Sequence, residues 1–228
     1  MKAIIFCGGL GTRLGIETKR IPKPMVKIQG IPILERIINL FRKFGVKNFI
    51  LATGYKSKII ENYFKKKKNI EVKCVFTGLY TNTGGRLLKL RKYIKKDEIF
   101  FVTYGDGLSD QNLKQLIKFH ISKKKIGTLT VVRPPARFGE VTIDKNRLVS
   151  KFQEKPRVNN GWINGGFFIF NKNIFSYIKK NEIFEKKPLE RLVKKKQLVA
   201  FRHEGLWQCM DTQRDKKILI DLVKKRKF

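Results

Sequence analysis

The stretch Ala3–Leu14, AIIFCGGLGTRL, decides the fold of this 228-residue chain. An apolar run with strand character leads directly into a glycine-rich turn that carries Arg13, and a second cation, Lys23, follows in the segment PKPM. Glycines let a backbone approach phosphate oxygens closely and direct its N–H groups at them. Arg13 and Lys23 add the positive charge that backbone N–H groups lack. The stretch therefore predicts a strand followed by a turn that holds a triphosphate.

The turn matches neither of the two common phosphate-binding loops. A dinucleotide-binding fingerprint, GxGxxG, needs a glycine where Leu14 stands. A P-loop needs GK[ST] at its end, and Thr12-Arg13 does not provide it. The motif alone therefore leaves a second interpretation open, which is a tight strand-to-helix turn with a surface arginine.

Length and composition indicate one globular domain. A chain of 228 residues with 42% hydrophobic residues can bury a substantial core. No apolar run approaches the ~20 residues of a membrane span, and the apolar start is too short for a signal peptide. The three cysteines contain no CxxC pair, so neither a disulfide framework nor a zinc site is expected. We expect a cytoplasmic protein with no membrane span.

The formal net charge of +34 is the most unusual feature of the composition. Such charge can attract nucleic acid or an anionic membrane, or it can reflect a surface whose exposed positions are filled with lysine. The lysines occur in clusters at the ends of probable helices, where cations suit the helix dipole. None of the clusters is interleaved with aromatic residues as a stacking platform would be. We therefore expect no specific nucleic-acid binding.

Apolar runs alternate with helical patterns along the chain. Alternation of this kind indicates an α/β fold, Rossmann-like, with a mainly parallel twisted sheet flanked by helices. Pro134-Pro135 interrupts the pattern, and a small β-rich lobe is expected after it. Strands are predicted over 2–7, 47–52, 70–76, 98–104, 127–133, 139–143, 163–170 and 198–202. Helices are predicted over 32–44, 57–64, 86–93, 110–122 (capped by Ser109 or Asp110), 172–179, 187–195 and 213–225.

Two carboxylates stand where a hard cation could bind. Asp106 lies between two glycines at the end of an apolar strand, and Asp211 lies just before the last predicted helix. Two carboxylates together with substrate phosphates and water would satisfy Mg²⁺, which rarely uses a cage made of protein alone. The alternatives are a turn aspartate at 106 and a helix N-cap at 211, where Thr212 is a competing cap.

Eight short motifs occur in one order along nearly the whole chain, and on them it resembles the sugar-1-phosphate nucleotidyltransferases. The forms TGGR, TYGDG, RFG and WQxMDT point to the cytidylyl branch of that family, which has a nucleotidyltransferase fold of the GT-A-like type. The motifs are GGLGTRL (8–14), PKPM (22–25), TGGR (83–86), TYGDG (103–107), RFG (137–139), FQEKP (152–156), INGGFF (163–168) and WQCMDT (207–212).

The resemblance implies a role for each matching residue. One domain would comprise a nucleotide-binding half over 1–133 and an acceptor-binding, closing half over 134–228. Arg13, Lys23 and Lys155 would be catalytic, and Asp106 and Asp211 would bind Mg²⁺. The nucleotide would contact Gly8, Gly9, Gly11, Thr12, Thr83, Gly84, Arg86 and Asp106, with Arg86 near the base. The acceptor would contact Tyr104, Gly139, Glu154, Lys155, Asn164 and Trp207.

The activity implied by the resemblance is transfer of a cytidylyl group from CTP to a sugar 1-phosphate, with α-D-glucose 1-phosphate as the expected acceptor and Mg²⁺ as cofactor. The segment between Val72 and Thr83 is shorter than in the family. In the family, that segment helps to build subunit contacts and lies near the substrate. Its shortness in this chain therefore bears on both the expected homo-oligomer and the identity of the acceptor. The alternatives are another phosphorylated acceptor, such as a heptose phosphate or a non-sugar phosphate, and a non-catalytic nucleotide- or RNA-binding relative.

Overall fold

A seven-stranded sheet forms the centre of the computed structural model, which describes residues 1–95, 99–134, 140–153 and 161–225. The strand order is β12-β8-β11-β6-β1-β4-β5, and β11 runs antiparallel to both of its neighbours while the other pairs are parallel. The strands are β1 (Lys2–Cys7), β4 (Asn48–Thr53), β5 (Glu71–Phe76), β6 (Phe100–Tyr104), β8 (Gly127–Val132), β11 (Ile163–Phe170) and β12 (Leu198–His203).

Alternating side chains of the central strands bury both faces of this sheet. In β1, Ile5 belongs to the core on one face, whereas Ile4 and Phe6 belong to the core on the other. Successive side chains of a strand point to opposite faces, so a continuously apolar strand needs helices on both sides. The first core takes in α2 (Ile33–Lys43), α3 (Ser57–Lys65), α5 (Leu113–Lys123) and α7 (Gln213–Lys224). The second takes in α4 (Thr83–Lys89), the 3₁₀ helix η4 (Lys172–Tyr177) and α6 (Lys187–Lys194).

Short elements at one end of the sheet bring distant parts of the chain together. β7 (Gly107–Ser109) pairs with β13 (Trp207–Cys209), and the N–H of Met210 donates to the carbonyl of Asp106 over 2.8 Å. This pairing places the segment before α7 beside the end of β6. The remaining short elements are η1 (Thr12–Leu14), α1 (Ile16–Arg20), η2 (Lys23–Met25), β2 (Lys27–Ile28), β3 (Ile31–Pro32) and η3 (Arg91–Tyr93).

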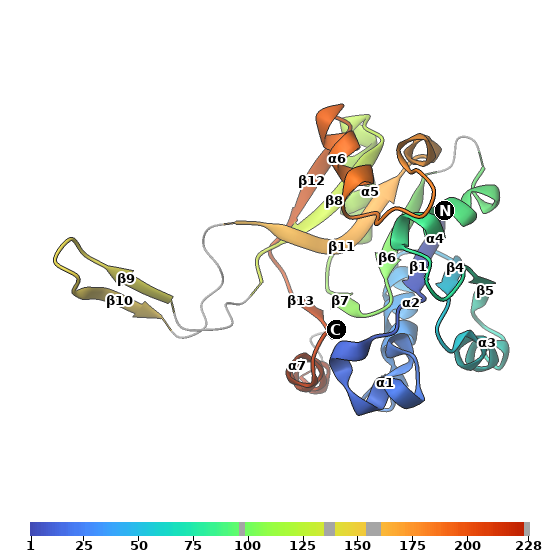
Figure 1. Ribbon diagram of the computed structural model, residues 1–228, viewed down its shortest axis with the longest axis horizontal. Coiled ribbons are helices and arrows are strands. Elements are labelled where there is room, and N and C mark those ends of the chain that lie inside the picture. The colour runs from blue at the N-terminus through green and yellow to red at the C-terminus, as the bar shows by residue number, and fades with distance from the viewer. Residues whose placement is uncertain (96–98, 135–139, 154–160, 226–228) are drawn as a thin grey trace.

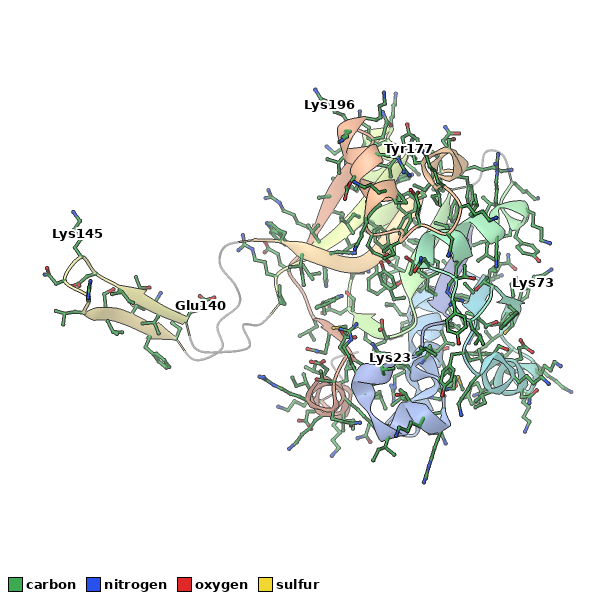
Figure 2. The ribbon with its side chains drawn as sticks, in the orientation of Figure 1. Lys23, Lys73, Glu140, Lys145, Tyr177 and Lys196 are labelled. Atoms are coloured by element: carbon green, nitrogen blue, oxygen red, sulfur yellow. The ribbon has the colours of Figure 1, made fainter. Side chains whose placement is uncertain are left out.

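A hairpin of β9 (Glu140–Ile143) and β10 (Val149–Gln153) extends away from the body (Figure 1). Glu140 and Lys145 lie on it, whereas Lys23 lies within the body (Figure 2). Val141 stands opposite Phe152, and both side chains are exposed. An isolated two-stranded hairpin is at best marginally stable in water. We therefore expect the hairpin to be much less stable than the central sheet, which is buried on both faces.

The fold class expected from the sequence is confirmed, because the sheet is mainly parallel and has helices on both faces. The sheet takes strands from both predicted halves of the chain, and the division near residue 133 stays a prediction. Among the described residues, no helix is long and apolar enough to cross a membrane.

Three local predictions are wrong. The segment predicted as a helix over 172–179 is the 3₁₀ helix η4. The helix predicted from 86 begins at Thr83, so the TGGR motif forms its first turn. Asn112, rather than Ser109 or Asp110, caps α5, since residues up to Ser109 stay extended in order to pair with β13. Thr212 is confirmed as the cap of α7, where it forms a capping box with Asp215.

Candidate active site

The glycine turn after β1 lines a cavity of about 650 Å³. Gly8, Gly9 and Gly11 all contribute to its wall. A Cβ on Gly8 would stand 2.0 Å from Nη1 of Arg86, and Gly11 has a φ of +69° that L side chains rarely adopt. The turn therefore needs glycine for two different reasons, which are close packing at Gly8 and backbone conformation at Gly11.

Arg86 packs against the glycine turn and holds it through hydrogen bonds. Its side chain is buried, with 4% of its surface exposed. The guanidinium donates to the carbonyl of Thr53 (3.1 Å), the hydroxyl of Thr77 (2.6 Å), the carbonyl of Gly8 (3.0 Å) and the carbonyl of Leu79 (3.2 Å). Burial lowers its pKa, but an arginine stays charged in proteins. Arg86 thus joins the turn to β4 and to the loop before α4, and its contact with a base stays a prediction.

Lys23 lies between the two predicted metal ligands. Its Nζ is 2.6 Å from Oδ2 of Asp106 and 2.6 Å from Oδ1 of Asp211. Burial alone would lower the pKa of Lys23, but the two carboxylates outweigh burial and raise it. Only 12% of the Lys23 side chain is exposed, so this ammonium is held firmly beside the cavity.

Arg13 occupies the outer side of the same cluster. Its Nη1 donates to Oδ2 of Asp211 over 2.8 Å, and 74% of its side chain is exposed. Arg13 therefore has freedom to move that Lys23 lacks. The carboxylates of Asp106 and Asp211 hold Lys23 and Arg13 near the cavity. A ligand with more negative charge could then take the place of these carboxylates as the partner of the two cations.

Asp106 and Asp211 have the donor chemistry that a divalent cation requires. Their carboxylates come close enough for one ammonium to contact both, and carboxylate oxygens are the ligands that Mg²⁺ prefers. The capping box of α7 holds the backbone of Asp211, whose N–H donates to Oδ2 of Asp215 over 3.1 Å. These two residues fit a metal ion whose other ligands come from substrate and water.

A second cavity of about 70 Å³ adjoins the first and shares Tyr104 and Asp106 with it. Asn164 and Trp207 line this smaller cavity. The indole N–H of Trp207 donates to the carbonyl of Gly165 over 2.7 Å, and Oδ1 of Asn164 accepts from the N–H of Gly166 over 2.7 Å. The structure thus brings together three of the residues predicted to face the acceptor.

Thr12 and Gly84 do not line either of the two cavities. Gly139, Glu154 and Lys155 lie outside the described residues. Gly84 packs inside α4, where its N–H donates to the carbonyl of Glu182 and a Cβ would stand 2.6 Å from that oxygen. Thr12 begins η1 at the end of the glycine turn.

Sequence reasoning missed Glu185. This half-buried residue lies before α6 and lines the larger cavity. Its carboxylate accepts from the hydroxyls of Thr83 (2.6 Å) and Tyr104 (2.5 Å). The segment around it, NEIFEKKPL, contains two glutamates and two lysines and gives no signal strong enough to identify a site residue.

The parallel sheet, the glycine turn and the lysine–aspartate cluster define a nucleotide-handling α/β protein. The model of the nucleotidyl transferase family matches residues 2–212, and the chain belongs to that family. The expectation of a nucleotidyltransferase is thereby confirmed. Enzymes of this family generally use a divalent metal ion.

Comparison with individual proteins shows which members of the family this chain resembles. The chain is 41% identical to the glucose-1-phosphate cytidylyltransferase of Salmonella typhi, over 100% of this chain and 97% of the relative. It is 39% identical to the D-glycero-alpha-D-manno-heptose 1-phosphate guanylyltransferase of Campylobacter jejuni, over 77% of this chain and 78% of the relative. The crystal structure of HddC from Yersinia pseudotuberculosis superposes with a TM-score of 0.77 at 28% identity, over 97% of this chain and 99% of that one.

Proposed function

We propose that this protein transfers a cytidylyl group from CTP to α-D-glucose 1-phosphate, giving CDP-glucose and pyrophosphate. The observation that carries the proposal is the pair of adjoining cavities, a larger one beside the glycine turn and a smaller one beside Asn164, which share Asp106. The end-to-end likeness to a cytidylyltransferase supports the choice of nucleotide and acceptor. The expected cytoplasmic location and homo-oligomer stay predictions.

The larger cavity would take the nucleotide. The glycine turn would approach the base, ribose and phosphates, and Arg13 and Lys23 would meet the triphosphate. The smaller cavity would hold the sugar against Tyr104 and Trp207, whose flat faces suit the C–H surface of a sugar ring. The shared wall at Asp106 would bring the acceptor phosphate next to the α-phosphate.

The reaction would be an in-line displacement. A phosphate oxygen of the acceptor attacks the α-phosphorus of CTP, the new P–O bond forms, and the bond to the leaving pyrophosphate breaks. The attacking oxygen is already ionised at neutral pH, so no general base is required. Catalysis then depends on positioning and on neutralising charge.

Arg13 and Lys23 would supply the positive charge. Both cations are paired with Asp211 in the structure, so binding of a triphosphate would exchange one anionic partner for another rather than place a bare charge in the cavity. Asp106 and Asp211 would hold Mg²⁺. That ion, when bound, would draw the two substrate anions together and offset charge on the phosphates.

A heptose 1-phosphate is the second candidate acceptor. The likeness to a heptose 1-phosphate guanylyltransferase favours it. A non-sugar phosphate remains the broader form of this alternative. A non-catalytic RNA-binding role is disfavoured because Arg13, Lys23, Asp106 and Asp211 form an intact cluster.

The test is pyrophosphate release with Mg²⁺ over a matrix of nucleotides and acceptors. CTP, UTP, dTTP and GTP would each be combined with glucose 1-phosphate, a heptose 1-phosphate and a non-sugar phosphate. We expect the highest kcat/KM for CTP with glucose 1-phosphate. A preference for GTP with the heptose phosphate would replace this proposal with the second candidate. No release with any pair, together with tight salt-dependent RNA binding, would exclude catalysis.

A further inference from the structure

Two arginines and a tryptophan meet where three neighbouring strands come together. Arg133 directly follows β8, Trp162 directly precedes β11, and Arg202 lies in β12. Cζ of Arg133 is 4.6 Å from the centre of the Trp162 ring, and Cζ of Arg202 is 5.6 Å from it. The face of an indole ring attracts cations, which helps to hold each guanidinium in a defined place. These three residues, called here the arginine stack, line neither of the two cavities.

The positive charge of the arginine stack is exposed and is not neutralised by a nearby acidic side chain. Among the residues that the structure describes, neither guanidinium forms an ion pair with a carboxylate, and both arginines are exposed. Two like charges held on one ring repel each other, and an anion beside them would relieve that repulsion. A guanidinium that stacks by its face keeps the N–H donors at its rim for a phosphate or a carboxylate. The arginine stack therefore has the charge and the donors of an anion-binding site.

Strand register places the arginine stack near the smaller cavity, which Asn164 lines. The strands β12, β8 and β11 are neighbours in the sheet (Figure 1), and Arg202, Val131 and Asn164 form one row across them. Residues paired in this way share a face of the sheet, and Trp162, two residues before Asn164, shares it too. From the usual strand spacing and rise per residue, the backbone of Asn164 is about 10 Å from that of Arg202 and about 7 Å from that of Trp162.

The order of the strands gives the direction in which an acceptor would point. From β6, which ends two residues before Asp106, the sheet continues through β11 with Asn164 to β8 and then to β12. An acceptor whose transferred phosphate lies near Asp106 and whose ring lies against Asn164 would therefore have its far end toward the arginine stack. Glucose 1-phosphate has only a hydroxyl group at that end. An acceptor with a second anionic group there would meet the two guanidiniums.

We propose that the arginine stack is a subsite for a second anionic group, a phosphate or a carboxylate, at the end of the acceptor remote from the transferred phosphate. Arg133 and Arg202 donate hydrogen bonds to this group, and Trp162 keeps their guanidiniums in place. The inference rests on the proposed function for the position of the transferred phosphate. It extends the acceptor class from glucose 1-phosphate to phosphorylated acceptors that carry two anionic groups.

Pyrophosphate release at saturating CTP with three acceptors tests the subsite. Glucose 1,6-bisphosphate carries a second phosphate, glucuronic acid 1-phosphate carries a carboxylate, and glucose 1-phosphate carries neither. We expect at least one of the two doubly anionic acceptors to have a KM about tenfold lower than that of glucose 1-phosphate, and which one does identifies the group. The double variant Arg133→Ala/Arg202→Ala should abolish this advantage and leave the KM for glucose 1-phosphate within about twofold.

A matched control separates the subsite from the general attraction of anions to a chain with a formal net charge of +34. Arg91→Ala/Lys92→Ala also removes two exposed cations, from η3, and should keep the whole KM advantage. An equal loss of the advantage in both double variants would overturn the proposal. So would an advantage that Arg133→Ala/Arg202→Ala retains, or a wild type that binds all three acceptors with the same KM.

Tryptophan fluorescence separates this inference from the proposed function, because it needs no catalysis. The chain has two tryptophans, so Trp207→Phe leaves Trp162 as the only one. Titration of this variant with inorganic phosphate at constant ionic strength should give a saturable change in Trp162 emission, which Arg133→Ala/Arg202→Ala should remove.

The two ideas can then fail separately. No saturable change, or a change that survives loss of both arginines, would overturn the inference even if CMP transfer is confirmed. A response to single-stranded RNA but not to phosphate would overturn it as well. A wild type that is inactive with every nucleotide and acceptor, but whose Trp162 responds to phosphate through the two arginines, would instead overturn the proposed function.

Discussion

The end of the site that we propose for the nucleotide and the end that we propose for the acceptor, called here the nucleotide end and the acceptor end, are built in different ways. The nucleotide end is formed where three neighbouring parallel strands end: β1, which leads into the glycine turn, β4, which ends at Thr53, and β5, which leads into the loop before α4. The acceptor end is assembled from the ends of β6, β11 and β13, which lie far apart in the sequence. Short sequence motifs therefore identify most of the nucleotide end. The acceptor end forms only when strands that are distant in the sequence pair with one another.

The two ends also differ in their electrostatics. The nucleotide end contains a buried guanidinium bonded to uncharged oxygens and an ammonium held between two carboxylates. At the proposed acceptor end, Asn164 and Trp207 make hydrogen bonds to backbone groups. Charge would bind the phosphates, and neutral hydrogen bonds would orient the sugar. Substitutions at the nucleotide end should therefore have the larger effects.

The largest effect is expected from Lys23→Ala. Loss of the ammonium would remove a charge that we propose faces the triphosphate, so kcat should fall by a factor of about a hundred or more. Steady-state pyrophosphate release at saturating CTP and glucose 1-phosphate measures it. Lys27→Ala, on the exposed side of β2, is the control and should retain near-wild-type kcat. Near-wild-type turnover in Lys23→Ala would remove Lys23 from the catalytic residues.

The next largest effect is expected from Arg86→Ala, which tests the support beneath the glycine turn. Loss of a buried charged donor leaves several oxygens without their partner, so the free energy of unfolding should fall by about 2 kcal/mol and the KM for CTP should rise. Urea unfolding and steady-state kinetics measure the two quantities. Arg91→Ala, at an exposed position, should change neither. An unaffected KM for CTP would show that the turn keeps its shape without Arg86.

A smaller effect is expected from Trp207→Phe at the acceptor end. The ring face is kept, but the N–H that donates to Gly165 is lost, so the acceptor KM should rise about fivefold while the KM for CTP stays constant. Trp162→Phe is the control, because Trp162 stacks with Arg133 and does not line either cavity. Equal changes in both KM values would contradict a separate acceptor end.

The smallest effect is expected from Glu182→Gln, which weakens the loop that braces α4. Glu182 pairs with Arg191 through two hydrogen bonds of 2.6 Å, and its carbonyl accepts from Gly84. The hydrogen bonds from Arg191 lower the pKa of Glu182 from 4.5 to about 2. A carboxylate with a lowered pKa stabilises the folded state above its unfolded pKa, and that stabilisation is lost as the pH falls toward the folded pKa.

The wild type should therefore exceed Glu182→Gln in free energy of unfolding by less than about 1 kcal/mol at pH 7. This difference should stay constant down to about pH 5 and shrink as the pH falls from 4.5 toward 2. Urea unfolding over a pH series measures it. Glu190→Gln, whose carboxylate pairs with Lys187 in an exposed position, is the control. A difference that grows on acidification would contradict the lowered pKa.

Much of the nucleotide end could be predicted from the sequence. The apolar run at the start of the chain, the glycines of the turn and the cations at 13 and 23 are close together in sequence, and all of them line or flank one cavity. The role of Arg86 could not be predicted in the same way. Its four acceptors come from the glycine turn, β4 and the loop after β5, and only the folded sheet brings them to one guanidinium.

The acceptor end was only partly predictable. Tyr104, Asn164 and Trp207 could be named from motifs, but nothing in those motifs indicated Glu185, which accepts a hydrogen bond from Tyr104. A carboxylate between two hydroxyls is defined by three-dimensional proximity alone. Side-chain hydrogen bonds across many residues leave no periodic signal in a sequence.

By itself, the sequence determined the α/β class and the nucleotide-handling turn, because hydrophobic periodicity and glycine content act within a few residues of one another. The tertiary structure alone decided that β11 runs against its neighbours, that Lys23 stands between Asp106 and Asp211, and that Glu185 faces Tyr104. These features depend on which distant segments pair once the core is buried. The hydrophobic effect, which favours burial of both faces of the sheet, selects those pairings.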